Sequence, residues 1–393
     1  MKIDFLWSQR EKDKYFLALD FGTQVLKSLI FKREGEKIVI LGAISETFEH
    51  PEMSDKQYFQ PELIKKILTR VIQNSKNQAG VKKIEYILLG FSSNILKSRI
   101  SIRNFNRNNP TEKIQEKEEG EITKKILAIT RQEISHTISQ EFGILPSDIT
   151  FINSRILEIK NDGYNIPQLK GFSGQNLDFR IISTFLLKYY LGVIIKVLKD
   201  LNLKNIRIIQ PAENLNVSIQ DKKINGLFLD IGGSMTQILL LRDGEFQVMD
   251  EFPLGGEIFT QQLSEKLGIT KAEAEDLKIR YSNRLLSEEV RSRIKEFLIA
   301  PTQSWFKNLN KKLKNSNISQ SKGLLSSNIF LLGGGSQLLE IEDILANGNW
   351  DSQNFPSKPR VKIISPNDLK GIEDKTKKIN NPQYVPPLLI CYG

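Results

Sequence analysis

Short apolar runs separated by glycine turns open the chain. Tyr15–Leu19 leads into Asp20 to Thr23, and the stretches Val25–Phe31 and Lys37–Thr47 follow as two more predicted strands. After Pro61, aliphatic residues recur at helical spacing, at Leu63, Ile64, Ile67, Leu68, Val71 and Ile72. The pattern therefore predicts a strand meander that begins with a glycine loop and has one face covered by an amphipathic helix. A buried strand, residues 84–90, follows it.

The same layout appears a second time. An apolar run from Leu227 reaches a second acidic glycine loop at Asp230, and two strands with a glycine turn between them follow, at 237–242 and 246–252. The aspartate precedes the turn glycine by 15 positions in the first copy (Asp20 to Gly35) and by 14 in the second (Asp230 to Gly244). Near-equal spacing of this kind indicates a duplicated lobe, with the two copies facing each other across a cleft.

The middle of the chain has a different pattern. Residues 103–125 are polar and charged, which predicts a mobile surface loop. Helical spacing follows over 122–142, a strand over 148–161, and then a strand over 179–187 that leads into a helix ending near Leu201. These segments predict a small α+β unit inserted into the first lobe.

Composition excludes several classes of site and protein. Hydrophobic residues are 39% and charged residues 26% of 393, as in a soluble globular chain long enough for two domains. One cysteine, Cys391, permits no internal disulfide and no Cys-based zinc site, which fits a reducing cytoplasm. His50 and His136 lie far apart and lack metal-ligand spacing, so structural or surface roles are expected for both.

The charge and hydropathy of the chain indicate which partners and which membrane or signal segments to expect. The net charge of +10 favours anionic partners, but lysine is abundant throughout the chain, so we expect no nucleic-acid partner. The longest apolar stretch, 179–198, is interrupted by three basic residues and is a poor candidate for a membrane-spanning helix. Residues 1–14 lack the apolar core of a signal peptide.

The loops suggest phosphate chemistry. A strand that ends in Asp-x-Gly and turns back leaves backbone N–H groups at its tip, where they can bind phosphate oxygens. Asp20 and Asp230 would lie beside those phosphates, where a carboxylate is useful only if a divalent cation lies between, so Mg²⁺ is implied, held through water. A third cluster, Gly333 to Ser336, follows the predicted strand 328–332 and precedes a helix, so backbone can approach a nucleoside closely there.

These residues resemble the actin-like ATPase superfamily, and within it the FtsA family of cell-division proteins. The two phosphate motifs and the adenosine motif look like residues 20–23, 230–236 and 333–336, and the signature of the inserted FtsA subdomain looks like residues 163–177. Pro253 to Gly256, the helix 273–281 and the C-terminal stretch 382–393 are also similar to FtsA. The resemblance implies an α/β, actin-like (ribonuclease H-like, duplicated) two-lobed nucleotide-binding fold with an inserted small α+β subdomain of the SHS2 type.

The resemblance also implies domain boundaries and ligand residues. It gives a first lobe at 1–88, the inserted subdomain at 89–187, a return at 188–222, a second lobe at 223–368 with a helical subdomain at 256–324, and a final return at 369–393. ATP and Mg²⁺ are the implied cofactors, with Asp20 and Asp230 at the metal. The expected nucleotide-binding residues are Asp20, Gly22, Thr23, Gln24, Asp230, Gly232, Gly233, Ser234, Thr236, Glu275, Lys278, Gly333, Gly334, Gly335 and Ser336. Glu275 and Lys278 would reach the ribose and adenine, and their alternative is an exposed ion pair.

Two departures from the FtsA pattern put hydrolysis in doubt. Gln24 replaces the family's lysine, with Lys27 further on as in the pilus protein PilM, and the second loop lacks a closing aspartate. The expected function is that of an ATP-binding adaptor with slow or absent hydrolysis. It would polymerise and link the C-terminal peptide of FtsZ to the membrane, peripherally on its cytoplasmic face.

Alternatives remain open at this point. A PilM-like pilus-assembly adaptor is the first. A small-molecule kinase of the same fold is the second, although it needs a substrate-facing carboxylate that we cannot nominate. A scaffold that binds no nucleotide is the third. FtsA proteins usually carry an amphipathic helix after the final Tyr-Gly. Here the segment from Ile3 to Lys14, with four apolar and three basic residues, is the candidate for membrane contact, against a terminus that is disordered or packed in the core.

Overall fold

The computed structural model describes residues 14–48, 59–221, 223–315, 325–350 and 355–393. It divides them into two compact units. Ile95–Ile195 form one, and the segments before and after it form the other. Residues 1–13, which include most of the candidate membrane segment, and His50 lie outside the described residues.

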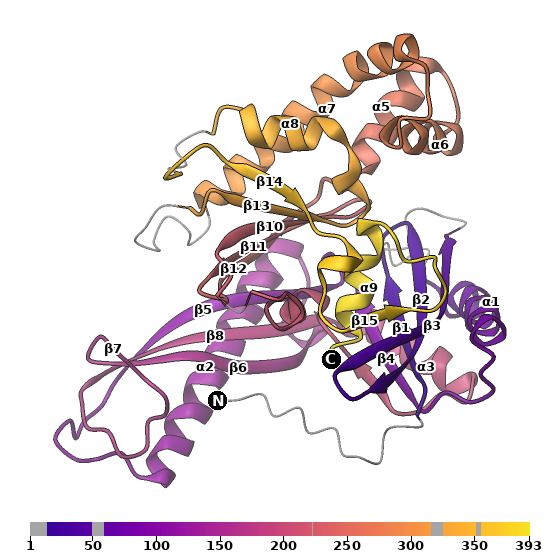
Figure 1. The fold of residues 1–393 in the computed structure, drawn as a ribbon. Helices are drawn as coiled ribbons and strands as arrows, with labels where there is room; N and C mark the ends of the chain where they lie inside the picture. Colours follow the sequence, from indigo (N-terminus) through magenta and orange to yellow (C-terminus); the bar gives the residue numbers. More distant parts are fainter. Residues whose placement is uncertain (1–13, 49–58, 222, 316–324, 351–354) are drawn as a thin grey trace. The chain divides into compact units, whose positions relative to one another are not determined.

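The larger unit contains two sheets with the same topology (Figure 1). The six-stranded sheet has the order β15 (Ile372–Asp374), β3 (Lys37–Thr47), β2 (Val25–Glu34), β1 (Phe16–Phe21), β4 (Tyr86–Phe91) and β9 (Ile206–Ile208). The five-stranded sheet has the order β12 (Glu245–Phe252), β11 (Thr236–Arg242), β10 (Gly226–Ile231), β13 (Asn328–Leu332) and β14 (Arg360–Ile363).

Five strands of the first sheet match the five strands of the second one by one, and β15 has no counterpart. In each, the aspartate-bearing strand pairs antiparallel with the next strand of its hairpin and parallel with a later strand, β4 or β13. Each meander also has a register shift at the corresponding place, at Ile30/Phe31 and at Leu240/Leu241. The duplication predicted from the spacing of Asp20 and Asp230 is therefore confirmed in the topology.

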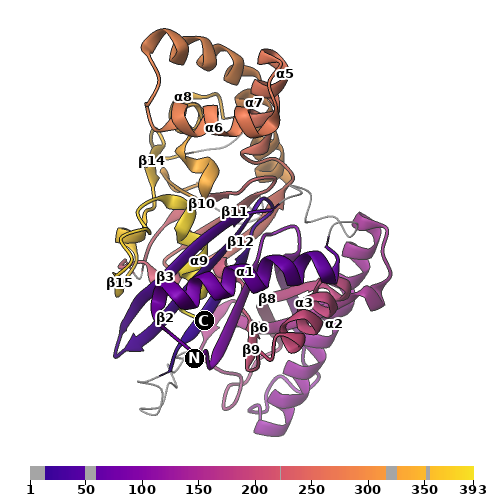
Figure 2. The same cartoon turned by 90° about the vertical axis from the view of Figure 1, so that its right-hand side faces the viewer.

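Helices cover the sheets because their apolar faces match the sheets' buried strands. Figure 2 shows α1 (Pro61–Ala79) lying across β2 and β3, and its buried residues include Ile64, Leu68 and Val71. This is the amphipathic helix that the sequence predicts, and it ends at Gly80, whose left-handed conformation (φ 66°) closes the helix. The short α9 (Val385–Ile390) returns to the first sheet and contacts β1.

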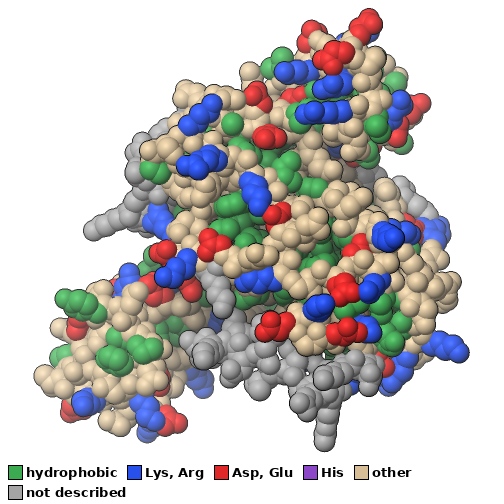
Figure 3. Space-filling model, viewed as in Figure 1, with side chains coloured by type: hydrophobic (Ala, Val, Ile, Leu, Met, Phe, Trp, Pro, Cys, Tyr) green, Lys and Arg blue, Asp and Glu red, His purple; other side chains and the backbone are tan. Residues whose placement is uncertain are grey.

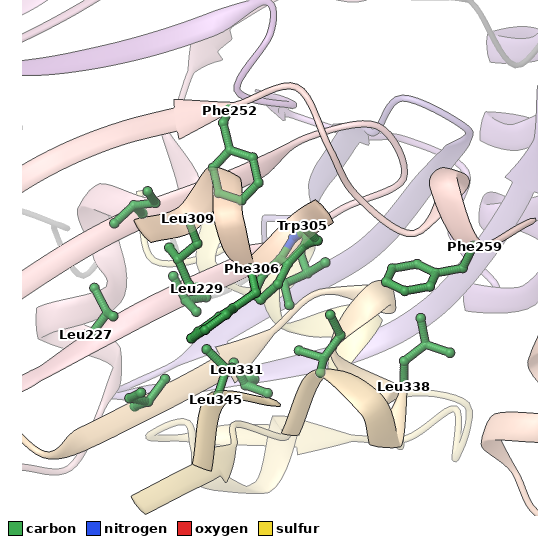
Figure 4. Packing of buried hydrophobic residues seen from close by; sticks show 14 of the residues in the cluster. Leu227, Leu229, Phe252, Phe259, Trp305, Phe306, Leu309, Leu331, Leu338 and Leu345 are labelled. Carbon is green, nitrogen blue, oxygen red and sulfur yellow. The ribbon is translucent and has the colours of Figure 1, made fainter. Parts of the chain in front are cut away.

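Several helices of the larger unit pack with the five-stranded sheet. Its helices are α5 (Glu257–Leu267), α6 (Lys271–Ser282), α7 (Glu288–Asn315) and α8 (Leu339–Asn347). Trp305 of α7 is fully buried, and its ring lies against Phe252 of β12 with centroids 6.0 Å apart. Figure 4 shows Trp305, Phe306 and Leu309 directed into a cluster that includes strand residues Leu229 and Leu331. This core holds β10 and β13, which end at the site described below.

The smaller unit is α+β. Its sheet has the order β5 (Leu96–Asn106), β8 (Asn176–Leu187), β6 (Ile149–Asn161) and β7 (Tyr164–Ile166), and α2 (Glu116–Phe142) packs on it through residues such as Ile122 and Ile126. The chain leaves it along α3 (Lys188–Asp200) and continues to the short α4 (Leu215–Ser218). An inserted α+β unit agrees with the predicted fold class, and its assignment to the SHS2 type stays a prediction.

One local prediction in this unit is wrong. Residues 103–125 were expected to be a surface loop, but 103–106 belong to β5 and 116–125 belong to α2. The polar residues mislead because both elements bury only one face. Arg107 shows the consequence, since its side chain is 1% exposed and pairs with Glu118 at 2.8 Å.

Candidate functional site

Two glycine loops lie at matching places in the two sheets. In the first, the amide of Gly22 donates to the carbonyl of Val25 at 3.1 Å, and in the second the amide of Gly232 donates to the carbonyl of Met235 at 2.9 Å. Each loop directly follows the strand that carries its aspartate, β1 or β10. The two hairpin tips are therefore built alike, as their spacing in the sequence predicts.

The two loops contact each other. The backbone amide of Ser234 donates to the hydroxyl of Thr23 at 3.0 Å. A β-carbon on Gly233 would lie 2.7 Å from that hydroxyl oxygen and 2.9 Å from the Cδ of Gln24. Any side chain at 233 would force Thr23 and Gln24 to move, so glycine suits this close approach of the two loops.

A third loop completes the site. Gly333 has a φ of 83°, and a β-carbon there would lie 2.4 Å from Oδ1 of Asp230. Gly334 then begins a short 3₁₀ turn, Gly334–Gln337, and has open space in front of it, since the nearest atom to an added methyl group would be Cβ of Gln383 at 3.8 Å. The third loop thus brings backbone alone next to the second loop's carboxylate.

The three loops surround one cleft of about 750 Å³ within the larger unit. The sequence-predicted residues that line it are Asp20, Gly22, Thr23, Gln24, Asp230, Gly232, Gly233, Glu275, Lys278, Gly333, Gly334 and Gly335. Residues from four separate stretches of the chain therefore meet at a single concave surface, the kind of site that binds small ligands.

Three predicted residues do not line the cleft. The hydroxyl of Thr236 is buried, donates to the carbonyl of Leu254 at 2.7 Å and accepts from the indole N–H of Trp305 at 2.9 Å. The hydroxyl of Ser336 donates to the carbonyl of Gly333 at 2.7 Å. Ser234 takes part through its amide alone, as described above. The hydroxyls of Thr236 and Ser336 therefore form hydrogen bonds within the protein that stabilise the loops, and neither residue lines the cleft.

Backbone N–H groups are available at the loop tips. The amides of Thr23, Gln24, Gly233, Gly334 and Gly335 have no acceptor among the residues that the structure describes. Amides held in this way, facing a cleft at the carboxyl ends of parallel strands, form a concave set of donors for an anion.

The carboxylates beside these amides are electrostatically strained. Burial raises the pKa of Asp230 to about 7, and the nearby negative charge of Asp20 adds to the rise, while Lys27 opposes it. Burial also raises the pKa of Asp20, although Lys27 lies 3.6 Å from its carboxylate. One lysine is therefore shared by two acids, of which Asp20 is buried and Asp230 half-buried, and a further cation near both would offset their charge.

These residues fit a magnesium ion that is held partly by ligand phosphates. Mg²⁺ in such sites keeps several waters and takes only one or two protein carboxylates. Over the described ranges of the chain, no cluster of three or more His, Cys, Asp or Glu side chains could hold a metal by itself. Asp20 and Asp230 would thus hold the ion only together with a bound anion.

Glu275 and Lys278 reach the cleft from α6 and form the i, i+3 ion pair that the alternative describes, with the Glu275 side chain 37% exposed. The Lys278 side chain is 10% exposed, and its Nζ lies 2.7 Å from Oε2 of Glu275. Thr260 of α5 hydrogen-bonds to the same carboxylate oxygen. The lysine end of the pair is buried in the wall of the cleft, and its carboxylate end is partly exposed.

Sequence reasoning missed several polar residues that line the cleft: Gln210, Gln237, Asn283, Asn381 and Gln383. A signal existed for Gln237. It pairs with Asp230 across the second hairpin as Lys27 pairs with Asp20 across the first. Aligning the two copies position by position would have placed both residues at the site. The other four come from loops that carry no repeat.

A model of a known protein family matches the part of the chain that holds two of the three loops. Residues 227–387, which hold the second and third loops, match the family model "Cell division protein FtsA". This stretch of the chain is therefore similar to FtsA. The FtsA-like region includes Pro253 to Gly256, α6 and the stretch from Pro382, all of which the sequence resemblance had picked out. No curated protein matches the chain.

Solved structures extend the similarity to almost the whole chain. The "PilM-PilN type IV pilus biogenesis complex" has a TM-score of 0.66 and 14% identity, with 96% of this chain and 97% of that chain covered. EutJ from Carboxydothermus hydrogenoformans has a TM-score of 0.49 and 11% identity over 96% and 90% of the two chains. MreB5 of Spiroplasma citri bound to ADP has a TM-score of 0.48 and 11% identity over 97% and 96%. At these identities the similarity establishes the fold alone.

Two surface properties bear on possible partners. No helix in the described ranges combines the length and apolar character needed to cross a membrane. On the face shown in Figure 3, the described basic side chains are interspersed with acidic ones. On this face, the positive charge of the described lysine and arginine side chains is therefore mixed with negative charge.

Proposed function

We propose that this protein is an ATP-binding, actin-like cell-division adaptor that hydrolyses ATP slowly or not at all. The observation that carries the proposal is the meeting of two equivalent acidic glycine loops and a third glycine loop at one cleft. The FtsA family match over 227–387 supports the division role over other roles of the fold.

Particular groups would hold each part of the nucleotide. The amides of Thr23, Gln24 and Gly233 are suited to the phosphates because their N–H groups have no acceptor in the described chain. Asp20 and Asp230 would take the magnesium ion, which supplies positive charge at the phosphates. The open backbone at Gly334 suits the nucleoside, where a side chain would be in the way.

Weak hydrolysis is proposed because the second loop has no acid after its glycines. Gln237 stands beside Asp230 and can orient a water but cannot accept a proton at neutral pH. The hydroxyl of Thr236 is engaged with Leu254 and Trp305 and is directed away from the cleft.

A nucleotide that contacts both loops would favour the closed arrangement of the two sheets, and a ligand shifts a conformational equilibrium only through such differential contacts. We propose that the closed form assembles head to tail into filaments, binds the FtsZ C-terminal peptide and lies against the inner face of the cell membrane. The domain scheme given by the resemblance, with the inserted subdomain between the halves of the first lobe, goes with this proposal.

A PilM-like role in pilus assembly is the second candidate. It is favoured by the coverage and TM-score of the PilM-PilN complex and by Lys27, whose spacing from the first loop is PilM-like. The two roles share the cleft and differ in the partner.

Gly334→Ala tests nucleotide binding with little effect on the fold. The added methyl group would meet no protein atom closer than 3.8 Å, so only a ligand should sense it. Gly120→Ala is the matched control, because Gly120 lies on α2 of the other unit, also with open space around it. In calorimetric titration with MgATP, we expect Gly334→Ala to weaken binding about tenfold or more, equivalent to ~1.4 kcal/mol, and Gly120→Ala to leave it unchanged. No binding by the unmodified protein would contradict the proposal.

The partner decides between the two roles. Fluorescence anisotropy with a labelled FtsZ C-terminal peptide, and separately with labelled PilN peptides, should show binding to the FtsZ peptide alone, in the presence of MgATP. Binding to a PilN peptide alone would assign the pilus role.

A further inference from the structure

The ammonium group of Lys278 has all of its hydrogen-bond donors in use. Its Nζ donates to the carbonyl of Gly256 at 3.0 Å, to the hydroxyl of Thr260 at 2.8 Å and to the carboxylate of Glu275 at 2.7 Å. A lysine has three N–H donors. Lys278 is also only 8% exposed, so it lies in the cleft wall with none of its donors left for a ligand.

Gly256, whose carbonyl accepts a hydrogen bond from Lys278, is itself hydrogen-bonded to the second phosphate loop. The amide of Gly256 donates to the carbonyl of Gly232 at 2.8 Å, and the amide of Glu257 donates to the carbonyl of Gly233 at 2.8 Å. These bonds hold the two carbonyls away from the cleft. Because a peptide unit is planar, fixing the carbonyl of Gly232 also fixes the direction of the amide of Gly233, which is available for phosphate.

Thr260 connects the network to α5 from outside the cleft. Its side chain is 4% exposed and is absent from the residues that line the cleft, so it cannot touch a bound nucleotide. Its hydroxyl accepts from Lys278 and donates to Glu275. Without this hydroxyl, the buried ammonium group would lose one of its three partners and could shift away from Gly256.

We infer that Lys278 and Thr260 form a buried anchor that positions the second phosphate loop, and that Lys278 acts on the phosphates through Gly256 instead of contacting the base. This inference rests on the proposed nucleotide binding and specifies how its phosphate half is organised. It differs from the role that the FtsA resemblance implied for Lys278, which was direct contact with ribose and adenine.

Splitting the ligand into its two halves separates the two roles. Magnesium tripolyphosphate reports on the phosphate loops, adenosine reports on the nucleoside side, and MgATP reports on both. The variants are Thr260→Val, which keeps the shape of the side chain, and Lys278→Met, which keeps its length without the charge. Thr302→Val is the matched control, since Thr302 is equally buried, donates to the carbonyl of Leu298 within α7 and does not line the cleft.

The expected result is that Thr260→Val and Lys278→Met weaken magnesium tripolyphosphate and MgATP by the same factor, about tenfold, as for a lost hydrogen bond to a charged group. Adenosine, followed by ligand-observed NMR, should bind unchanged, and Thr302→Val should change none of the three. Loss of adenosine binding with tripolyphosphate unchanged would overturn the inference and restore a base contact. An equal loss of all three ligands, or no loss of any, would also overturn it.

Nucleotide binding and the anchoring role of Lys278 and Thr260 can fail separately in these titrations. If the unmodified protein binds neither MgATP nor tripolyphosphate, the proposed function fails. If it binds both and Thr260→Val has no selective effect on the phosphates, only the inference about the anchor fails. Thr260→Val keeps the test available if Lys278→Met does not fold.

Discussion

Replacing Asp230 by asparagine should stabilise the nucleotide-free protein above neutral pH. Burial raises the pKa of this carboxyl to about 7, with further help from Asp20 and opposition from Lys27. The folded chain therefore holds a proton on Asp230 between pH 4 and 7 that the unfolded chain releases. The free energy of unfolding therefore falls as pH rises through that window. The unfolded chain is stabilised by ionising Asp230, whereas the folded chain either keeps the proton or carries an unfavourable charge.

The size of the effect follows from the shift. A rise from 3.8 to about 7 corresponds to about 4 kcal/mol of unfolding free energy lost by the time the group is ionised. Water in the open cleft screens the charge, which reduces the expected loss to about 2–4 kcal/mol. Asparagine has nearly the same shape and no charge, so Asp230→Asn should recover this amount at pH 8 and a smaller part of it at pH 5, where the unfolded carboxyl is already ionised.

Urea unfolding at pH 5 and pH 8 measures the difference without nucleotide. The variant should be more stable than the unmodified protein at both pH values, by a clearly larger margin at pH 8 than at pH 5. Asp20→Asn is the contrasting variant, because it leaves the buried ammonium group of Lys27 without the carboxylate that lies 3.6 Å away, and it should destabilise the protein at both pH values. If Asp230→Asn is no more stable at pH 8, Asp230 is not a strained acid in the folded cleft.

Other predictions concern the loops and the core that supports them. Thr23→Val removes the acceptor of the Ser234 amide, so unfolding in urea should show a loss of about 1 kcal/mol, and an unchanged midpoint would mean that the two loops do not touch. Trp305→Phe leaves the Thr236 hydroxyl without its donor and creates a void in the core, which should cost about 1–3 kcal/mol by the same assay; a loss below about 0.5 kcal/mol, the range of ordinary surface substitutions, would refute this packing. Removing Mg²⁺ with EDTA should weaken ATP binding at least about tenfold, as expected if a cation joins the phosphates to Asp20 and Asp230, whereas equal calorimetric affinities with and without EDTA would exclude that role.

The sequence could predict the features that follow a regular pattern along the chain, either a duplicated motif or the hydrophobic spacing of a helix. The spacing of Asp20 and Asp230 from their turn glycines indicated two equivalent hairpins, and the sheets share strand order, direction and even the place of the register shift. The amphipathic pattern after Pro61 located α1 because one face of that helix is buried along its whole length.

The remainder depends on contacts that no local pattern encodes. Residues 103–125 look like a loop because an edge strand and a helix with one buried face carry many charges, and only packing distinguishes them from solvent-exposed chain. Thr236 and Ser336 belong to motif positions, but whether a hydroxyl faces the ligand or the core depends on neighbours such as Trp305 and Leu254, which are distant in sequence. The same holds for Lys278, two of whose three partners, Gly256 and Thr260, lie at the start of the neighbouring helix α5 and not on its own helix.

A crystal structure with a magnesium-bound, non-hydrolysable ATP analogue tests the central claim most directly. The account predicts the triphosphate between the loops at Gly22 and Gly233, the magnesium ion within water-mediated reach of Asp20 and Asp230, and the adenine against Gly334. A nucleotide bound elsewhere, or density that leaves this cleft without ligand at saturating concentration, would contradict it.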